Sequence, residues 1–366
     1  MMTFLTIAGV TGGVLAFRDD LDRRVNPQLW VIAPARSRAS LQDVIERVEG
    51  RFTDARVSTV TLPSRPDGPL IVYLSGKPVG LAGTGPRPEF SDAFVNPYTG
   101  EILGQRRAGR IVLGREYLIP LVVRLHDSLL LGPVGVWMLG GVAMVWLLTS
   151  VIGLGLAWPV MWRNATGWMQ TCSVRRGHGA LTTTYDLHRS LGVVLLPIWI
   201  VLAFSSVYLS FPGAVRSTTA LFSSVIALPV AKSEWVGGPI VTPDEAIANA
   251  LAAVPSATAF GLTRDFTHGR YSVRLVLPDD INPAGNSEAY VDFATGRVIA
   301  VRLSSSASAG QRFLYSQFPL HSGEAFGLWG RIVIAVSALA LVVMCVTGFY
   351  VWLPGWDVRR RKQALR

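Results

Sequence analysis

The chain has 366 residues, half of them hydrophobic, and its mean hydropathy is +0.38. So apolar a composition at this length excludes an ordinary soluble protein. The formal net charge of +10 does not indicate nucleic-acid binding, because the basic residues are scattered among acidic ones and form no stripe.

Four apolar stretches predict an α-helical membrane bundle of four transmembrane helices, at residues 1–17, 125–160, 188–211 and 320–354. The last three contain apolar runs long enough to cross a hydrocarbon layer of about 30 Å. The first has neither a basic leading segment nor a cleavage site, so we interpret it as a helix and not as a signal peptide. It is short for a complete span, and we interpret it as truncated.

The connecting segments predict the orientation of these helices. Segment 161–187 and the basic tail 355–366 are rich in arginine, which places both in the cytoplasm. Residues 18–124 and 212–319 are then expected on the outer side, in the periplasm, with the chain in a bacterial inner membrane. Both termini are expected in the cytoplasm.

Each outer segment is expected to fold as a small α+β domain. Residues 40–48 and 242–250 are typical of N-capped helices, and strand-like sequence follows each of them. Both segments close with a predicted hairpin turn, Asn96-Pro-Tyr-Thr-Gly in the first and Asp292-Phe-Ala-Thr-Gly in the second. The glycine of each turn supplies a positive φ between two strands.

The chain is internally duplicated. Adding 195 to the positions of one set of residues gives a second, identical set: His126, Gly132, Gly135, Gly153 and Pro159 correspond to His321, Gly327, Gly330, Gly348 and Pro354. This agreement in register predicts a repeated unit of helix, α+β domain and helix.

Three of the five histidines are predicted to begin apolar helices. His126 and His321 would open two equivalent helices at the same depth, an arrangement that can hold one haem iron from both sides. His188 would open the third helix on the cytoplasmic side and serve a second haem. The alternative for each is an interfacial histidine that caps a helix end, although histidines within membranes often mark ligands or pathways.

Other residues near these histidines have two interpretations each. The paired glycines, Gly132 with Gly135 and Gly327 with Gly330, suit either close helix packing or the approach of a flat macrocycle. Two arginines near the helix entrances either neutralise haem propionates or are ordinary interfacial residues. They are Arg124 and Arg331.

The duplication also predicts a partner for His188 from the first helix. Aligning Gly12-Gly13-Val14 with Ser205-Ser206-Val207 puts that partner about five residues before Met1. Either the start is assigned too late or the chain is truncated, or this lineage has lost the ligand and keeps one haem. His178 is a weaker substitute, expected in a solvated loop, and His268 is expected at the surface.

Several motifs together resemble one known family. They are Thr11-Gly12, Phe17-Arg-Asp-Asp-Leu, Asn96-Pro-Tyr-Thr-Gly-Glu, Leu187-His-Arg-Ser-Leu-Gly, Leu320-His-Ser-Gly-Glu-Ala-Phe-Gly and Thr347-Gly-Phe-Tyr-Val-Trp. Over nearly its whole length the chain resembles PepSY-associated transmembrane proteins, a group that includes inner-membrane ferric-siderophore reductases. The resemblance implies four helices, two PepSY-like periplasmic domains, haem b and reduction of ferric siderophores. Members of the family usually have a histidine at the position missing before Met1.

The predicted function is therefore that of a haem b-containing inner-membrane oxidoreductase with one haem or two. It would pass electrons from a quinol, a flavin or a partner protein to ferric iron, in a siderophore or another ferric chelate, on the periplasmic side. The ligands would be His126, His321 and His188. No catalytic side chain is predicted, because the sequence has no nucleophile elbow, zinc-ligand spacing or dinucleotide fingerprint. The alternatives are a non-catalytic PepSY membrane protein that binds or regulates a partner, and an accessory protein for metal uptake.

Overall fold

The structure is a computed structural model of the whole chain. It describes residues 1–77, 91–107, 112, 114–161, 165–175, 177–225, 233, 235 and 237–364, with side chains except for those of 156–161, 165–166 and 354–364. The side chains of the predicted basic tail, 355–366, therefore lie outside the described residues.

The chain forms two compact units. The helical unit comprises Met1–Arg18, Pro120–Leu221 and Ser316–Arg366, and the sheet unit comprises Asp19–Ile119 and Phe222–Tyr315. Each unit therefore draws on both halves of the duplicated sequence.

The helices that lie wholly or partly in the helical unit, in chain order, are α1 (Met2–Leu15), α5 (Leu118–Ser128), α6 (Pro133–Met161), α7 (Ala165–Cys172), α8 (Ala180–Val194), α9 (Leu196–Ser210), α10 (Pro212–Ala220), α12 (Ala309–Ser322), which enters this unit at Ser316, and α13 (Gly327–Ala364). Within the described residues, two stretches are long and apolar enough to cross a membrane, Pro133–Gly155 and Glu324–Leu353. The pair α8 and α9 makes a third if it is counted as one span, and α1 is a shorter apolar helix.

The third predicted span, 188–211, is not one straight helix. It begins earlier, at Ala180, and bends by 67° between α8 and α9. Pro197 lies in the first turn of α9. Proline has no backbone N–H and its ring clashes with the carbonyl four residues before it, so a continuous helix breaks here. Apolar composition alone does not reveal this bend.

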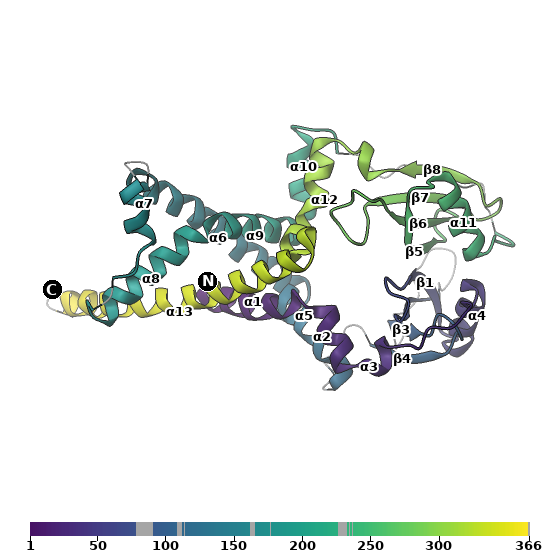
Figure 1. Cartoon of the computed structure of the whole chain (residues 1–366), viewed down its shortest axis with the longest axis horizontal. Helices are drawn as coiled ribbons and strands as arrows, with labels where there is room; N and C mark the ends of the chain where they lie inside the picture. Colours follow the sequence, from purple (N-terminus) through teal and green to yellow (C-terminus); the bar gives the residue numbers. More distant parts are fainter. Residues whose placement is uncertain are drawn as a thin grey trace. The chain divides into compact units, whose positions relative to one another are not determined.

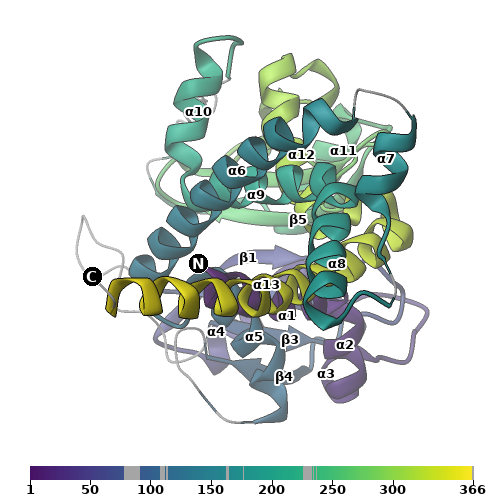
Figure 2. The ribbon, with the colours of Figure 1, turned by 90° about the vertical axis from the view of Figure 1, so that its left-hand side faces the viewer.

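Helices from the two halves pack against each other inside the helical unit. Figures 1 and 2 show α1 beside α13 and α6 beside α9. Small residues permit the close approach: a Cβ at Gly9 would lie 3.1 Å from the carbonyl oxygen of Ala338, and one at Gly140 would lie 2.4 Å from the ring of Phe211. The first-half helices α1 and α6 thus find their main partners in the second half.

The sheet unit contains one antiparallel sheet of eight strands in the order β4-β3-β2-β1-β5-β6-β7-β8. The strands are β1 (Ala55–Thr61), β2 (Leu70–Gly76), β3 (Asp92–Val95), β4 (Ile102–Arg106), β5 (Thr258–Asp265), β6 (Arg270–Val276), β7 (Ser287–Asp292) and β8 (Val298–Arg302). The two halves join where β1 pairs with β5 in the register Thr59↔Thr263. The segments predicted as two separate α+β domains are therefore halves of one sheet, because the first strand of each half pairs with the other.

Helices α4 (Leu41–Arg51) and α11 (Pro243–Ala253) cover one face of this sheet. Both start with the predicted caps: Ser40 and Thr242 each accept a hydrogen bond from the backbone three residues later. In addition, the Asp244 carboxylate of α11 accepts hydrogen bonds from the backbone of Leu41 and Gln42 at the start of α4. The second half thus caps a helix of the first.

Two short helices, α2 (Arg18–Val25) and α3 (Pro27–Trp30), precede the first half of the sheet. Asp22 of α2 accepts two hydrogen bonds from the Arg106 guanidinium of β4, at 2.7 and 2.8 Å, and both side chains are buried. This two-pronged geometry fixes orientation as well as position. It fastens α2 to the edge strand of the sheet.

The two predicted hairpin turns are confirmed between β3 and β4 and between β7 and β8. Gly100 and Gly296 have φ of +69° and +68°. Asn96 Oδ1 accepts hydrogen bonds from the two backbone N–H groups that follow Pro97, and Asp292 Oδ1 does the same in the second turn. The turns are built alike, with a neutral amide in one and a carboxylate in the other.

Replacing Asp292 with asparagine should remove an acid-sensitive contribution to stability. Burial by itself raises the pKa of Asp292, but hydrogen bonds from Ser233 and Thr295 hold it below its usual value. A group with a lowered pKa stabilises the fold above its unfolded pKa, near 4, and this contribution is lost as the pH falls through the folded pKa. At pH 7 we expect D292N to cost about 1 kcal/mol, since charge-assisted hydrogen bonds exceed neutral ones by roughly that amount.

Thermal unfolding of D292N and the unchanged protein between pH 3 and 7 measures this difference, as a midpoint lower by roughly 2–4 °C at pH 7. The difference should vanish at the acid end. Asn96→Asp, in the sister turn, is the matched reverse change. Equal midpoints for D292N and the unchanged protein at every pH would show that the charge contributes nothing.

Candidate functional site

Two of the predicted ligands meet in the helical unit. His126 lies in the last turn of α5 and His321 in the last turn of α12. Their ring centroids are 6.1 Å apart and their planes differ by 55°. The prediction that these residues open the apolar helices was wrong, because each ends the helix before, and α6 and α13 begin several residues later.

Glycine accounts for these breaks. Gly132 and Gly327 have φ of +60° and +58°, a conformation that other residues rarely adopt, so each reverses the chain at the start of an apolar helix. A Cβ at Gly135 would lie 1.6 Å from the carbonyl oxygen of Ser128, and one at Gly330 would lie 2.1 Å from that of Gly323. The paired glycines thus fold the turn back on itself. This local role was not among those considered from the sequence.

A hydroxyl group holds each ring. Thr11 Oγ1 of α1 lies 2.9 Å from His126 Nδ1, and Ser205 Oγ of α9 lies 2.9 Å from His321 Nδ1. Both hydroxyl groups are buried, and each also lies within hydrogen-bond distance of a carbonyl in its own helix, Thr11 to Ile7 at 2.6 Å and Ser205 to Leu202 at 3.0 Å.

These contacts favour one histidine tautomer. A hydroxyl group has one proton, and when it donates that proton to the helix carbonyl, only its lone pairs face the ring. In this arrangement Nδ1 carries the proton and donates it to the hydroxyl oxygen. The second nitrogen, Nε2, keeps a free lone pair, which is the form of neutral imidazole that binds a metal.

His188 has the same environment, in the middle of α8 and not at a helix start. Its Nδ1 lies 3.1 Å from Thr347 Oγ1 of α13, and that hydroxyl donates to the carbonyl of Val343 at 2.8 Å. A glycine lies against the ring: a Cβ at Gly348 would be 2.9 Å from His188 Cε1. Gly12 lies against His126 in the same way, at 3.0 Å.

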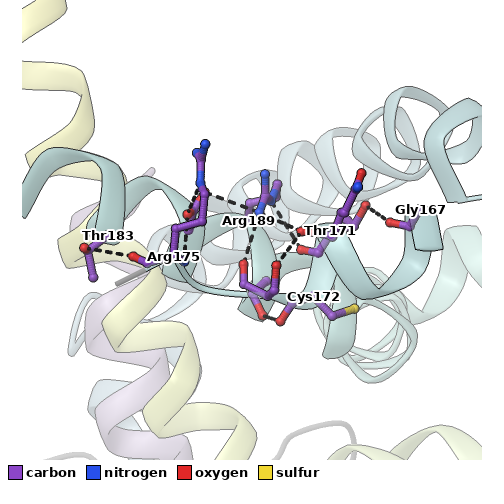
Figure 3. Close-up of polar contacts among 10 residues, drawn as sticks. Gly167, Thr171, Cys172, Arg175, Thr183 and Arg189 are labelled. Carbon is purple, nitrogen blue, oxygen red and sulfur yellow. Dashed lines mark hydrogen bonds and ion pairs between the residues drawn. The ribbon is translucent and has the colours of Figure 1, made fainter. Parts of the chain in front are cut away.

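An ionic network around the buried carboxylate of Asp186 fixes the part of α8 that carries His188 (Figure 3). Asp186 is fully buried and accepts hydrogen bonds from the Arg175 side chain at 2.8 and 3.1 Å. Arg189 approaches the same carboxylate at 3.3 Å and donates to three carbonyls at the end of α7, those of Gln170, Thr171 and Ser173. Through Arg189 the network ties the end of α7 to α8, at Asp186 and Arg189, two residues before and one residue after His188.

The residues around His126 and His321 fit a haem group. A metal bound between two imidazoles lies about 2 Å from each coordinating nitrogen, which puts the ring centroids roughly 6 Å apart. The observed separation is 6.1 Å. In addition, Arg124 Nη1, on α5, is buried without a hydrogen-bond partner among the described residues, as expected of a group that awaits a propionate. Arg331, in contrast, donates to the carbonyl of Ala16 at 2.6 Å and lies over the Phe17 ring.

A bare metal ion fits less well. Within the described residues, no group of three or more His, Cys, Asp or Glu side chains could hold one. Two imidazoles suffice only when the remaining positions on the metal are filled by another molecule, as a porphyrin fills them. His178 carries no contact of this kind among the described residues, and His268 pairs with Asp265 in the sheet unit at 2.8 Å.

The hydroxyl partners were not predicted from the sequence. Thr11 and Ser205 are 194 positions apart, close to the 195 positions between His126 and His321. This spacing was the feature of the sequence that could have identified them as equivalent partners of the two histidines. The alignment of Gly12 with Ser205 was one residue away from the correspondence that the structure shows.

Helices that are long and apolar enough to cross a bilayer, in a chain that also contains an antiparallel sheet unit, indicate a membrane protein. The chain matches the family model described as the PepSY-associated TM region over residues 1–354, and it belongs to that family. This confirms the resemblance seen in the sequence. A search of curated proteins found no significant match.

Proposed function

We propose that this protein is a haem b-containing oxidoreductase that passes electrons across a bacterial inner membrane and reduces ferric iron, in a siderophore or another ferric chelate, on the periplasmic side. The observation that carries the proposal is the pair His126 and His321, which approach each other from equivalent positions with both Nε2 atoms left free. His188 is proposed as the ligand of a second haem toward the cytoplasm.

The proposed topology has four crossings, by α1, α6, the bent pair α8–α9, and α13. Both termini would be cytoplasmic, and the sheet unit periplasmic. The support is the apolar character of these helices and the arginine-rich segment 161–187, which favours the cytoplasmic side.

The chain's own residues hold and orient the redox centre. Thr11 and Ser205 would each accept a hydrogen bond from the Nδ1–H group of a ring, which fixes the orientation of the imidazole and leaves Nε2 to bind the metal. Arg124 would neutralise a propionate. The bound haem supplies reversible one-electron transfer, chemistry that no side chain of the site provides.

Reduction would release iron without destroying its carrier. Fe(III) is a hard cation held tightly by oxygen ligands, and the added electron weakens that hold. No general acid or base is required, which agrees with the absence of a predicted catalytic side chain. The electron donor is proposed to be a quinol, a flavin or a partner protein.

The experiment is an absorption spectrum of the purified protein, expressed with haem available. We expect a red protein whose Soret band is that of low-spin b haem, and whose reduced form is reoxidised on addition of a ferric chelate. Colourless protein that remains folded would contradict the haem and favour a binding or regulatory PepSY protein. Red protein whose reduced form does not react with ferric chelates would contradict the acceptor.

A further inference from the structure

A polar groove lies in the sheet unit, on the face opposite α4 and α11. Its volume is about 410 Å³ and its floor is formed by strands of both halves, β1, β2, β5, β6 and β7. Alternation along the strands explains the two faces: Tyr271, Val273 and Leu275 point into the core, whereas Arg270 and Ser272 line the groove. A groove of this size is large enough for a small organic ligand.

Both acids in the groove are already engaged. Asp265 pairs with Arg270 at 3.3 Å and with His268 at 2.8 Å. Glu288 pairs with Arg302 at 3.0 Å and accepts a hydrogen bond from the Tyr290 hydroxyl. The acids therefore have little capacity left to neutralise a further cation.

Arg56 is the cation that remains. Its guanidinium lies over the ring of Phe266 at 4.0 Å, and it has no carboxylate partner within ion-pair distance among the described residues. Arg264 lies over the same ring at 4.8 Å but is paired with Glu49 at 2.7 Å. Burial, and then the charge of Arg264, lower the pKa of Arg56. An anion bound beside Arg56 would stabilise its positive charge against both burial and the repulsion from Arg264.

Hydroxyl-bearing side chains line the same groove as this cation. Ser75 is the residue directly across from Arg56 on β2, and Thr263 and Ser272 face each other on β5 and β6. The side chains of Ser75 and Ser272 make no hydrogen bond to a described residue. They can donate to an oxygen atom held by the guanidinium.

We propose that this groove binds a small molecule through a carboxylate group, with Arg56 as its bidentate partner and the neighbouring hydroxyls as additional donors. The planar fork of arginine matches a carboxylate in shape. Arg56, which has no carboxylate within ion-pair distance among the described residues, matches the single charge of one carboxylate group, whereas a phosphate dianion carries two charges on one group. Further carboxylates of a polycarboxylate can stay in solvent, because the groove is open on one side. The site is independent of haem and holds whether or not the helical unit binds one.

The test is calorimetric titration of the detergent-solubilised full-length protein with citrate, with triethyl citrate and with inorganic phosphate. Citrate should bind, and the uncharged ester should not. Arg56→Ala should weaken citrate binding at least tenfold, and Arg56→Lys should fall between, because lysine keeps the charge but loses the fork. Arg51→Ala is the matched control on the helix-covered side, and it should bind as the unchanged protein does.

Several results would overturn the proposal: no citrate binding by the unchanged protein, ester binding as tight as citrate, or equal affinities for the Arg51 and Arg56 variants. Phosphate binding tighter than citrate would overturn the carboxylate class. If Arg56→Ala does not fold, the comparison of citrate with its ester on the unchanged protein, and the Arg56→Lys titration, still decide the matter.

Discussion

Replacing His321 with alanine is expected to abolish the low-spin haem spectrum of the purified protein at its outer site. With one imidazole removed, the iron loses an axial ligand, and His126 alone cannot hold it in the same state. His126→Ala should have the same effect, because the two rings occupy equivalent positions. The measurement is the Soret and α-band absorption of the oxidised and reduced protein, together with haem content per chain.

His268→Ala is the matched control, since that histidine belongs to the sheet unit and is hydrogen-bonded there to Asp265. It should leave the spectrum unchanged. A graded variant is Ser205→Ala, which keeps the His321 ring but removes the acceptor for its Nδ1 proton. The affinity of the protein for haem should fall by roughly ten- to a hundredfold, as it does for other metal ligands that lose the hydrogen-bond partner of their second nitrogen. An unaltered spectrum in both His321→Ala and His126→Ala would refute the shared centre.

Replacing Gly135 with alanine should disrupt the turn that positions His126. The added Cβ would lie 1.6 Å from the carbonyl oxygen of Ser128, a backbone atom that cannot rotate away as a side chain can. The helix start must move, and we expect a cost above about 3 kcal/mol, beyond the usual range for overpacking. Because Ser128 is two residues from His126, haem should be lost as well.

Gly141→Ala provides the matched control on the same helix, because a Cβ there has no atom within 4 Å. Alanine favours a helix over glycine by about 1 kcal/mol, so this variant should be as stable as the unchanged protein or slightly more so. Thermal unfolding and haem content measure both variants. If Gly135→Ala unfolds at the same temperature as Gly141→Ala and retains its haem, the turn does not position the histidine.

The sequence predicted the equivalence of His126 and His321 but not what surrounds them. The constant spacing of 195 is a property of the chain that needs no coordinates. Thr11 and Ser205, however, lie in other helices, and a lone hydroxyl in an apolar helix is ordinarily explained by its bond to a carbonyl one turn earlier. Both residues make that bond too, so nothing in their local sequence distinguishes them.

The helix boundaries near the site could not be predicted from the pattern of apolar residues either. The run Leu129-Leu130-Leu131 is apolar and suits a helix, yet Leu129 and Leu130 adopt φ of +52° and +62°. This turn brings the carbonyl of Ser128 against Gly135, a contact that the apolar pattern does not reveal. Similarly, each half of the sheet was predicted correctly as α+β, but the pairing of β1 with β5 joins residues about 200 positions apart, such as Thr59 and Thr263. The alternation of apolar and polar residues along a strand predicts which side chains face the core, but it does not predict which strand lies beside it in the sheet.

The exchange of partners between the two halves has an evolutionary consequence. Two identical half-length chains related by a two-fold axis would form the same contacts as the two halves of this chain. The first strands of the halves pair antiparallel, the contact of α1 with α13 is matched by that of α9 with α6, and each half contributes one histidine to the central pair. Duplication and fusion of the gene of such a homodimer would produce this arrangement. The two halves differ in detail, as the neutral Asn96 turn and the charged Asp292 turn show.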